Sequence, residues 1–170
     1  MRTLHAWVGI LLGLTAAAAV AQEPVKIGMV TTLSTKAGYL GEDIRDGFQL
    51  AIQQGGGQLG GVPVELLVDD DGRKPEKGKQ IAERFMKRDQ VKIMTGIVFS
   101  NVAMAVVPKV ARSGVFYISP NAGPSMLAGK GCNKNYFNVA WQNDNLDEVM
   151  GQFVGEAGYE NVYLLAPNYP

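Results

Sequence analysis

Histidine and cysteine are almost missing from this sequence. Its 170 residues contain one histidine, His5, and one cysteine, Cys132, and His5 lies in a segment that we expect to be removed. The remaining chain then has no histidine for an acid–base pair and too few Cys and His side chains for a zinc site. One cysteine also excludes an internal disulfide, so Cys132 is either a free thiol or half of a pair whose partner a truncated chain has lost.

Net charge is lacking as well. The chain has 16 basic and 16 acidic residues, and removal of Arg2 with the leader leaves a formal charge near −1. Such a balance argues against nucleic acid or an anionic membrane as the partner of this protein.

Residues 1–21 predict a cleavable export signal. They combine a basic start at Arg2, an apolar run from Ala6 to Leu14, and the small residues Ala19-Val20-Ala21 at the cleavage site. We therefore expect a periplasmic protein whose mature chain begins at Gln22. The apolar run is too short to favour the alternative, a membrane anchor.

The mature chain alternates apolar, β-branched strands with amphipathic helices. This pattern predicts an α/β fold, a parallel sheet with helices on both faces. Right-handed crossovers predict that the first four strands lie in the order second, first, third, fourth. We expect strands at residues 25–32, 62–68, 91–98, 114–119 and 161–166, a short extended segment at 136–140, and helices at 42–54, from 75 onward, at 100–112 and at 145–157. Pro108 should kink or shorten the third of these helices.

Three loops should meet at the carboxyl ends of these strands, where sheets of this type bind ligands. They are residues 33–41, 99–101 and 120–125. Ser100 opens a helix, so its hydroxyl can simply cap the first N–H groups. The same N–H groups, with the helix dipole, can also hold a carboxylate or phosphate.

Two other motifs are better explained without a ligand. Residues 55–61 match G-x-G-x-x-G, but a helix precedes them and a strand follows, the reverse of a dinucleotide site. Asp69-Asp70-Asp71-Gly72 lacks the alternating ligands of a calcium loop. We interpret the first as a connector and the second as a solvated turn that caps the next helix, with no metal or cofactor at either.

Several segments resemble, in this order, the substrate-binding proteins of branched-chain amino acid type ABC transporters: TTLS, YLGEDIRDGFQLAI, VDDDGRKP, GIVFSN, ISPNAGPS and WQND. These are type I periplasmic binding proteins with the leucine-binding domain. NAGPS, WQND and LLAPNY are most similar to the branch that binds aromatic acids. The resemblance implies two α/β lobes that close on a small carboxylate, no catalysis, and ABC transporter permease subunits as partners, with membrane contact only through the permease.

The resemblance also implies ligand-binding residues. Ser100 matches the serine that holds the ligand carboxylate, and Asn121, Ala122 and Gly123 match the loop whose backbone holds the ligand's polar end. Gly123 replaces a threonine that helps amino-acid binders hold the ammonium group. This departure favours an aromatic acid over a branched-chain amino acid.

Two further positions are implied at the wall of the cleft. Tyr39 or Leu40 falls at the position of an aromatic wall residue. Trp141 lies in the segment that resembles the first hinge crossing, where it either reaches the cleft or packs at the hinge.

The family is more than twice as long as this chain. The resemblance therefore divides the sequence into a signal peptide (1–21), an N-terminal lobe (22–140), and a hinge crossing with the start of an incomplete second lobe (141–170). Such a fragment should bind ligand weakly. Two alternatives are a ligand sensor with the same fold and a nucleotide-binding α/β enzyme, which would lack a correctly placed phosphate loop.

Overall fold

The computed structural model describes residues 22–166, so the expected export signal lies outside the described part. Strands and helices alternate as the sequence predicts. Their order is β1 (Val25–Thr31), α1 (Tyr39–Gln54), β2 (Gln58–Leu59), β3 (Val62–Asp70), α2 (Pro75–Lys87), β4 (Ile93–Thr95), α3 (Ser100–Arg112), β5 (Phe116–Ser119), α4 (Ser125–Ala128), β6 (Tyr136–Asn138) and α5 (Asn143–Glu156). None of the helices in residues 22–166 is long and apolar enough to cross a membrane.

The six strands form one sheet in the order β2-β3-β1-β4-β5-β6. Strands β3, β1, β4, β5 and β6 run parallel, whereas β2 pairs antiparallel with β3. The order of β3, β1, β4 and β5 confirms the predicted arrangement of the first four strands. The expected extended segment at residues 136–140 becomes β6, which joins the sheet at its edge beside β5.

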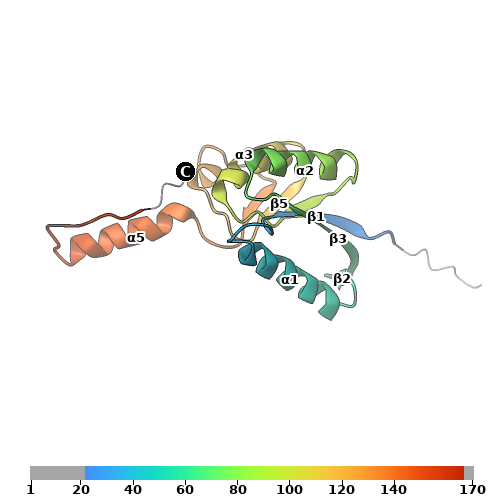
Figure 1. The fold of residues 1–170 in the computed structure, drawn as a ribbon, viewed down its shortest axis with the longest axis horizontal. Coiled ribbons are helices and arrows are strands. Elements are labelled where there is room, and N and C mark those ends of the chain that lie inside the picture. Colours follow the sequence, from blue (N-terminus) through green and yellow to red (C-terminus); the bar gives the residue numbers. More distant parts are fainter. Residues whose placement is uncertain (1–21, 167–170) are drawn as a thin grey trace, which may run out of the picture.

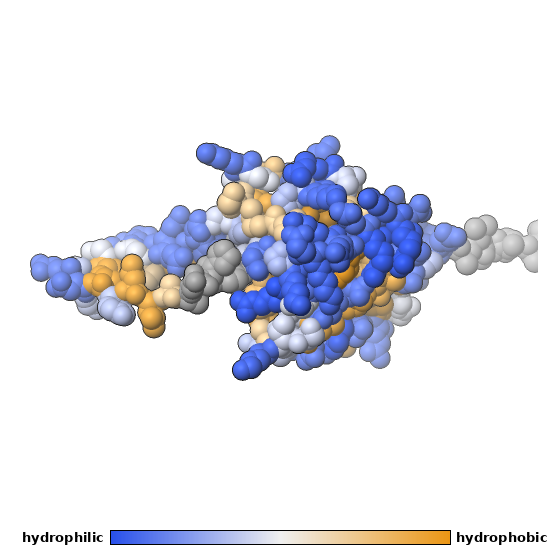
Figure 2. Space-filling model, turned by 45° about the horizontal axis from the view of Figure 1, so that its top comes forward, coloured by the Kyte–Doolittle hydropathy of each residue, from blue (hydrophilic) through white to orange (hydrophobic). Residues whose placement is uncertain are grey.

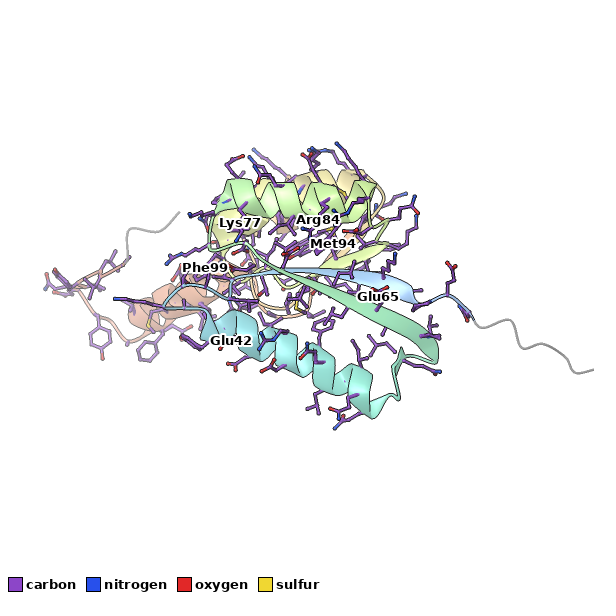
Figure 3. All side chains as sticks on the ribbon, turned by 45° about the vertical axis from the view of Figure 1, so that its right-hand side comes forward. Glu42, Glu65, Lys77, Arg84, Met94 and Phe99 are labelled. Carbon is purple, nitrogen blue, oxygen red and sulfur yellow. The ribbon has the colours of Figure 1, made fainter. Side chains whose placement is uncertain are left out.

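Helices cover the two faces of the sheet unequally (Figure 1). Helices α2 and α3 pack on one face, and α1 lies on the other. In Figure 3, Met94 points toward α2, whereas Glu42 lies on α1, across the sheet. Gly28 shows how closely the first layer is packed, since a Cβ on this residue would stand 2.6 Å from the Phe85 ring.

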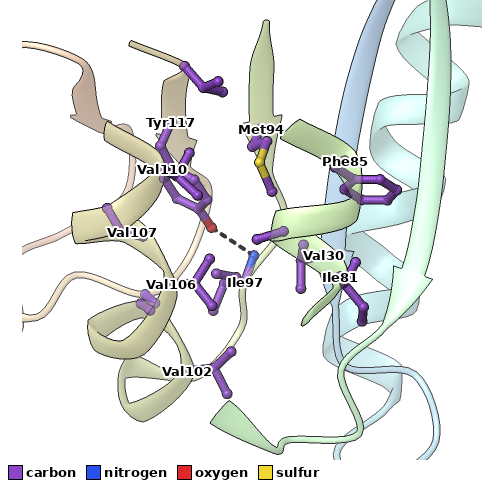
Figure 4. Packing of buried hydrophobic residues seen from close by; sticks show 14 of the residues in the cluster. Val30, Ile81, Phe85, Met94, Ile97, Val102, Val106, Val107, Val110 and Tyr117 are labelled. Atoms are coloured by element: carbon purple, nitrogen blue, oxygen red, sulfur yellow. Dashed lines mark hydrogen bonds between the residues drawn. The ribbon is translucent and has the colours of Figure 1, made fainter. Parts of the chain in front are cut away.

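The core lies between the sheet and the α2–α3 layer (Figure 4). Val102, Val106 and Val110, four residues apart in the sequence, form the buried face of α3 as predicted. Burial of each such side chain contributes about 1.5–3 kcal/mol. Tyr117 is fully buried in this layer, and its hydroxyl accepts a 3.1 Å hydrogen bond from the Ile97 N–H.

Strand β4 ends earlier than predicted, at Thr95 rather than at residue 98. Gly96 takes a left-handed backbone conformation (φ 101°), which turns the chain out of the parallel ladder. A Cβ at this position would also meet the Met29 side chain at 2.5 Å. The apolar residues that follow are buried by the approach to α3, so their hydrophobicity does not reflect strand pairing.

Other expectations also differ from the structure. Helix α1 begins at Tyr39 instead of residue 42. Pro108 does not shorten α3, which continues to Arg112. The expected strand at 161–166 is wrong: these residues are exposed and irregular, because no neighbouring strand among the described residues pairs with them. The short helix α4 was not expected.

Helix α5 projects from the body of the molecule (Figure 1). It has no buried residue. Its apolar side chains Leu146, Val149, Met150 and Phe153 are 57–66% exposed, and apolar surface is visible on this projecting part in Figure 2. The helix therefore carries an apolar face that the described residues do not cover.

Candidate functional site

A cavity of about 590 Å³ lies at the carboxyl edge of the sheet. Three segments that follow β4, β5 and β6 line it, so the strand order brings them together. The lining consists of Ser100, Asn101 and Met104 from α3, Pro124, Ser125 and Met126 around the start of α4, and Asn143 and Asp144 from α5. Of the predicted site residues, Ser100 lines this cavity.

Ser100 is the first residue of α3 and not its cap. Phe99 is the cap residue, with an extended backbone (φ −105°, ψ 135°) and no side-chain capping bond. The Phe99 carbonyl accepts hydrogen bonds from the N–H groups of Val102 and Ala103. The simple interpretation of Ser100 as an N-cap is therefore wrong. Its hydroxyl oxygen instead accepts a 3.1 Å hydrogen bond from Nδ2 of Asn143.

Helices α3 and α5 both begin at this cavity. Their first N–H groups and the positive ends of their dipoles favour a negative group there. Gln142 caps α5 by accepting a 2.9 Å hydrogen bond from the Asn145 N–H. Asp144 is the one charged residue in the lining, and its carboxylate favours a hydrogen-bond donor at that end of the cavity.

The predicted loop at residues 121–123 lies beside the cavity and is fastened to its neighbours. Asn121 donates from Nδ2 to the Val98 carbonyl at 2.8 Å, which ties the loop to the segment before α3. Ala122 is 3% exposed, and its carbonyl accepts a hydrogen bond from the Ser119 hydroxyl. The Gly123 carbonyl accepts from the Asn143 N–H at 2.8 Å. Asn143 thus connects this loop with Ser100.

Gly123 has a packing requirement that the sequence does not reveal. A Cβ at this position would lie 1.8 Å from the Trp141 carbonyl oxygen and 2.6 Å from Nδ2 of Asn138. No side chain fits without moving the backbone of the segment that leads into α5. The close crossing is therefore a structural reason for glycine at this position.

Tyr39, Leu40 and Trp141 do not line the cavity. Tyr39 is 59% exposed and opens α1, with the half-buried Leu40 next to it. Trp141 is 49% exposed, and its carbonyl accepts a 2.6 Å hydrogen bond from Asn138. The backbone of Trp141 therefore packs at the crossing, while about half of the residue remains exposed.

The acidic turn after β3 is not a solvated turn, and it does not cap α2. Asp71 is fully buried, and its Oδ1 accepts hydrogen bonds from the Thr32 hydroxyl (2.5 Å) and the Arg73 N–H (2.7 Å). The α2 cap is Lys74, without a side-chain bond. The sequence-based interpretation fails because β1 and β3 are parallel neighbours, which places Thr32 beside this turn.

The adjacent carboxylates Asp70 and Asp71 have pKa shifts of opposite direction. Burial raises the pKa of Asp71 above its ordinary value, although hydrogen bonds from Thr32 and Arg73 act against it. Partial burial alone would also raise the pKa of Asp70. Its hydrogen bonds outweigh that effect and lower the pKa far below the ordinary value; the donors are Leu33, Ser34, Gly72 and Lys77. No group of three or more His, Cys, Asp or Glu side chains in residues 22–166 could hold a metal ion.

Arg73 connects the same turn to the start of α3. Its guanidinium lies 4.3 Å from the centroid of the Phe99 ring, a cation–π contact. Its backbone is left-handed (φ 60°), which is uncommon for a residue with a side chain. The contact fixes the turn after β3 against the residue that precedes Ser100.

Sequence reasoning missed Asn143 as a site residue. The residue belongs to the WQND segment, but we expected the helix to begin at Asn145 and gave Asn143 no role. The sequence did contain a signal for an earlier helix start: polar residues of the kind that begin helices stand directly before a run of apolar residues at helical spacing. Cys132, by contrast, lies outside this cavity as an exposed free thiol among the described residues.

A parallel sheet covered by helices, with a cavity at its carboxyl edge beside the segments that follow β4, β5 and β6, has the architecture of a ligand-binding α/β lobe. The chain belongs to the periplasmic binding protein family, whose sequence model matches residues 24–170. The first lobe of a type I periplasmic binding protein has this fold, as the sequence predicts.

Relatives of known structure and sequence agree with this membership. A solute-binding protein of an ABC transporter from R. palustris, solved in complex with benzoate, is 30% identical with a TM-score of 0.74, over 79% of this chain and 38% of that one. An ABC transporter substrate-binding protein from Sphaerobacter thermophilus is 34% identical with a TM-score of 0.70, over 81% and 38%. Leu/Ile/Val-binding protein BraC3 of Rhizobium johnstonii is 28% identical over 89% of this chain and 41% of its own length. The chain thus spans about two fifths of the relatives that it matches.

Proposed function

We propose that this chain is the first lobe of the substrate-binding component of a branched-chain amino acid type ABC importer. In the periplasm it receives a small carboxylate and passes it to permease subunits, without catalysis. The observation that carries this proposal is the cavity at which α3 and α5 begin, with Ser100 and Asn143 joined by a hydrogen bond inside it. The names of the relatives support the same role.

Within this role we infer an aromatic acid as the preferred ligand. The benzoate complex of the R. palustris relative supports this choice, as does Gly123, which offers no hydroxyl to an ammonium group. A branched-chain amino acid is the second candidate, because the Asp144 carboxylate in the cavity lining could attract an ammonium group. Asn121, Ala122, Tyr39, Leu40 and Trp141 remain proposed ligand contacts, with Trp141 and Tyr39 reaching the ligand when a second lobe closes.

The proposed domain boundaries follow from the same role. Residues 22–140 form the first lobe, and residues 141–170 form the crossing and the start of a second lobe. The exposed apolar face of α5 supports this division, because such a face is normally buried against another layer. A ligand sensor with the same fold is the alternative. Neighbouring genes for a permease and an ATPase would favour the importer, and their absence the sensor.

A titration of the exported chain, followed by NMR, tests the ligand. We expect benzoate to shift the backbone amides of residues 100–103 and 143–145, with leucine producing smaller shifts at equal concentration. NMR suits the purpose because a single lobe supplies only part of the contacts and should bind weakly. Amide shifts that saturate at low leucine concentration, with no shifts for benzoate, would show that the preferred ligand is the amino acid and not the aromatic acid. No shift with either compound would contradict carboxylate binding at this cavity.

A further inference from the structure

Asn143 makes two hydrogen bonds that join three segments of the cavity. Its Nδ2 donates to the Ser100 hydroxyl oxygen at 3.1 Å, and its backbone N–H donates to the Gly123 carbonyl at 2.8 Å. We propose that Asn143 is a positioning residue for ligand specificity: it directs the Ser100 hydroxyl toward the acid group of the ligand. This role rests on the proposed function of the cavity as a carboxylate site.

The chemistry of a serine hydroxyl explains how Asn143 acts through Ser100. A hydroxyl has one O–H donor and two acceptor lone pairs. Because the N–H of Asn143 occupies a lone pair, the O–H must point in another direction. The received hydrogen bond also polarises the hydroxyl and strengthens its own donation. This hydrogen bond should strengthen the binding of an acid ligand more than that of a neutral one, since hydrogen bonds to a charged acceptor are about twice as strong as neutral ones.

Neighbouring contacts hold the backbone on either side of Asn143. The Trp141 carbonyl lies against Gly123, where no Cβ fits, and it accepts a 2.6 Å hydrogen bond from Asn138. On the other side, Gln142 caps the first turn of α5. Asn143 therefore stands between a crossing held by glycine and a capped helix. The backbone that carries the donor is held before ligand arrives, which reduces the ordering entropy spent on binding.

Asn143 also links the specificity of the site to the position of α5. The Ser100 hydroxyl belongs to α3, whereas its hydrogen-bond donor belongs to the first turn of α5. A displacement of α5 from α3 would break this bond and remove the donor that orients the hydroxyl. The acid preference of the cavity thus depends on the contact between the two helix starts.

A double-mutant cycle tests the proposal in the exported chain. Dissociation constants for benzoate and for neutral benzamide are measured by NMR for the wild type, Ser100→Ala, Asn143→Ala and the double variant. We expect Asn143→Ala to weaken benzoate binding about five- to tenfold, as loss of one oriented hydrogen bond implies, and benzamide binding by less. In the Ser100→Ala background the same substitution should change benzoate binding by less than about twofold, because the residues act as a unit.

Asn145→Ala is the matched control, since this residue lies in the same first turn and offers only its backbone N–H to a capping bond. It should leave the preference for benzoate over benzamide unchanged. Equal, additive losses for Asn143→Ala in both backgrounds would overturn the positioning role and leave the site itself intact. Absence of benzoate and leucine binding in the wild type would instead overturn the proposed function, and the positioning role with it. If Asn143→Ala does not fold, the isosteric Asn143→Asp should reverse the preference, because an aspartate accepts the Ser100 proton.

Discussion

The Trp141 carbonyl oxygen occupies the space where a side chain on Gly123 would begin, 1.8 Å from the ideal Cβ position. Because Gly123 has no side chain, the segment before α5 can lie directly against the loop after β5. Through the adjacent hydrogen bond from Asn143 to the Gly123 carbonyl, this close contact also sets the position of the residue that contacts Ser100. The geometry of the cavity therefore depends on a glycine outside its lining.

Gly123→Ala should destabilise the protein and disturb the cavity. The new methyl group meets backbone atoms that cannot rotate away, and overpacking of this kind costs about 1–3 kcal/mol. Chemical denaturation measures the free energy of unfolding. Gly151→Ala in α5 is the control, because its Cβ meets nothing within 4 Å; it should be neutral or stabilising by up to about 1 kcal/mol. Equal stability of Gly123→Ala and the wild type would show that the crossing is not close.

Ser100→Ala should weaken binding of an acid ligand by about 1.5–3 kcal/mol, if it removes a hydrogen bond to a charged group. The free energy of unfolding should fall by less than this, because Ser100 is not the cap of α3, although the substitution removes the acceptor of the Asn143 side chain. Titration with benzoate measures the effect. Ser113→Ala, at the other end of the same helix, is the control and should bind benzoate like the wild type. An unchanged affinity in Ser100→Ala would remove this hydroxyl from the site.

Tyr117→Phe should lower the free energy of unfolding by about 1–3 kcal/mol, because it leaves the buried Ile97 N–H without its acceptor. The fold itself should survive, since the ring stays in the core. Thermal denaturation compares this variant with Tyr159→Phe, which alters a side chain that is exposed and should have no measurable effect. A similar thermal unfolding midpoint for both variants would show that the Ile97 N–H forms a hydrogen bond with another acceptor.

Asp70→Asn should reduce stability near pH 7 by about 1–2 kcal/mol, the value of hydrogen bonds to a charged group that is not fully buried. The folded pKa of Asp70 lies below its ordinary value of 3.8, so the unfolded state binds the proton more tightly. Its stabilisation is complete above pH 3.8 and declines as the pH falls below that value. The decrease in the free energy of unfolding caused by Asp70→Asn should therefore be smaller at acidic pH. Urea denaturation at several pH values measures this dependence.

Asp71→Asn should show the opposite pH dependence of stability from Asp70→Asn. Burial raises the folded pKa of Asp71, so the carboxylate costs stability at neutral pH; this cost declines as the pH falls below the folded pKa and is gone below the ordinary value of 3.8. The isosteric amide can keep an oxygen acceptor for Thr32 and Arg73 without the buried charge. Asp71→Asn should therefore be least harmful at neutral pH. Identical pH profiles for the two variants would contradict the assigned environments.

The exposed face of α5 predicts self-association of this chain. Leu146, Val149, Met150 and Phe153 present apolar surface that isolated proteins rarely leave uncovered. Analytical ultracentrifugation should detect association that increases with concentration. Replacement of Val149 and Phe153 by lysine should shift the chain toward monomer. Replacement of Gln152 by lysine, which changes charge without removing apolar surface, should not. A wild-type chain that stays monomeric at all concentrations would contradict the prediction.

Local sequence patterns by themselves determined most of the longer elements and their order, but not β2, α4 or the irregular run at residues 161–166. Buried β-branched runs predicted β1, β3 and β5, and the four-residue spacing of valines predicted α3 from Ser100 to Arg112, because strand and helix periodicities depend on neighbours along the chain. Parallel strands with right-handed crossovers then placed the start of α3 at the ligand edge of the sheet. Ser100 could be selected from the sequence for this reason.

Only the tertiary structure decided which groups meet. Ser100 and Asn143 lie 43 positions apart, and Asp71 is buried because β1 places Thr32 beside it. The run at 161–166 has the composition of a strand, yet it stays irregular because a strand needs a partner for its backbone hydrogen bonds. Periodicity specifies the conformation that a segment favours, whereas burial, pKa and hydrogen-bond partners depend on which distant segments the sheet brings to its side.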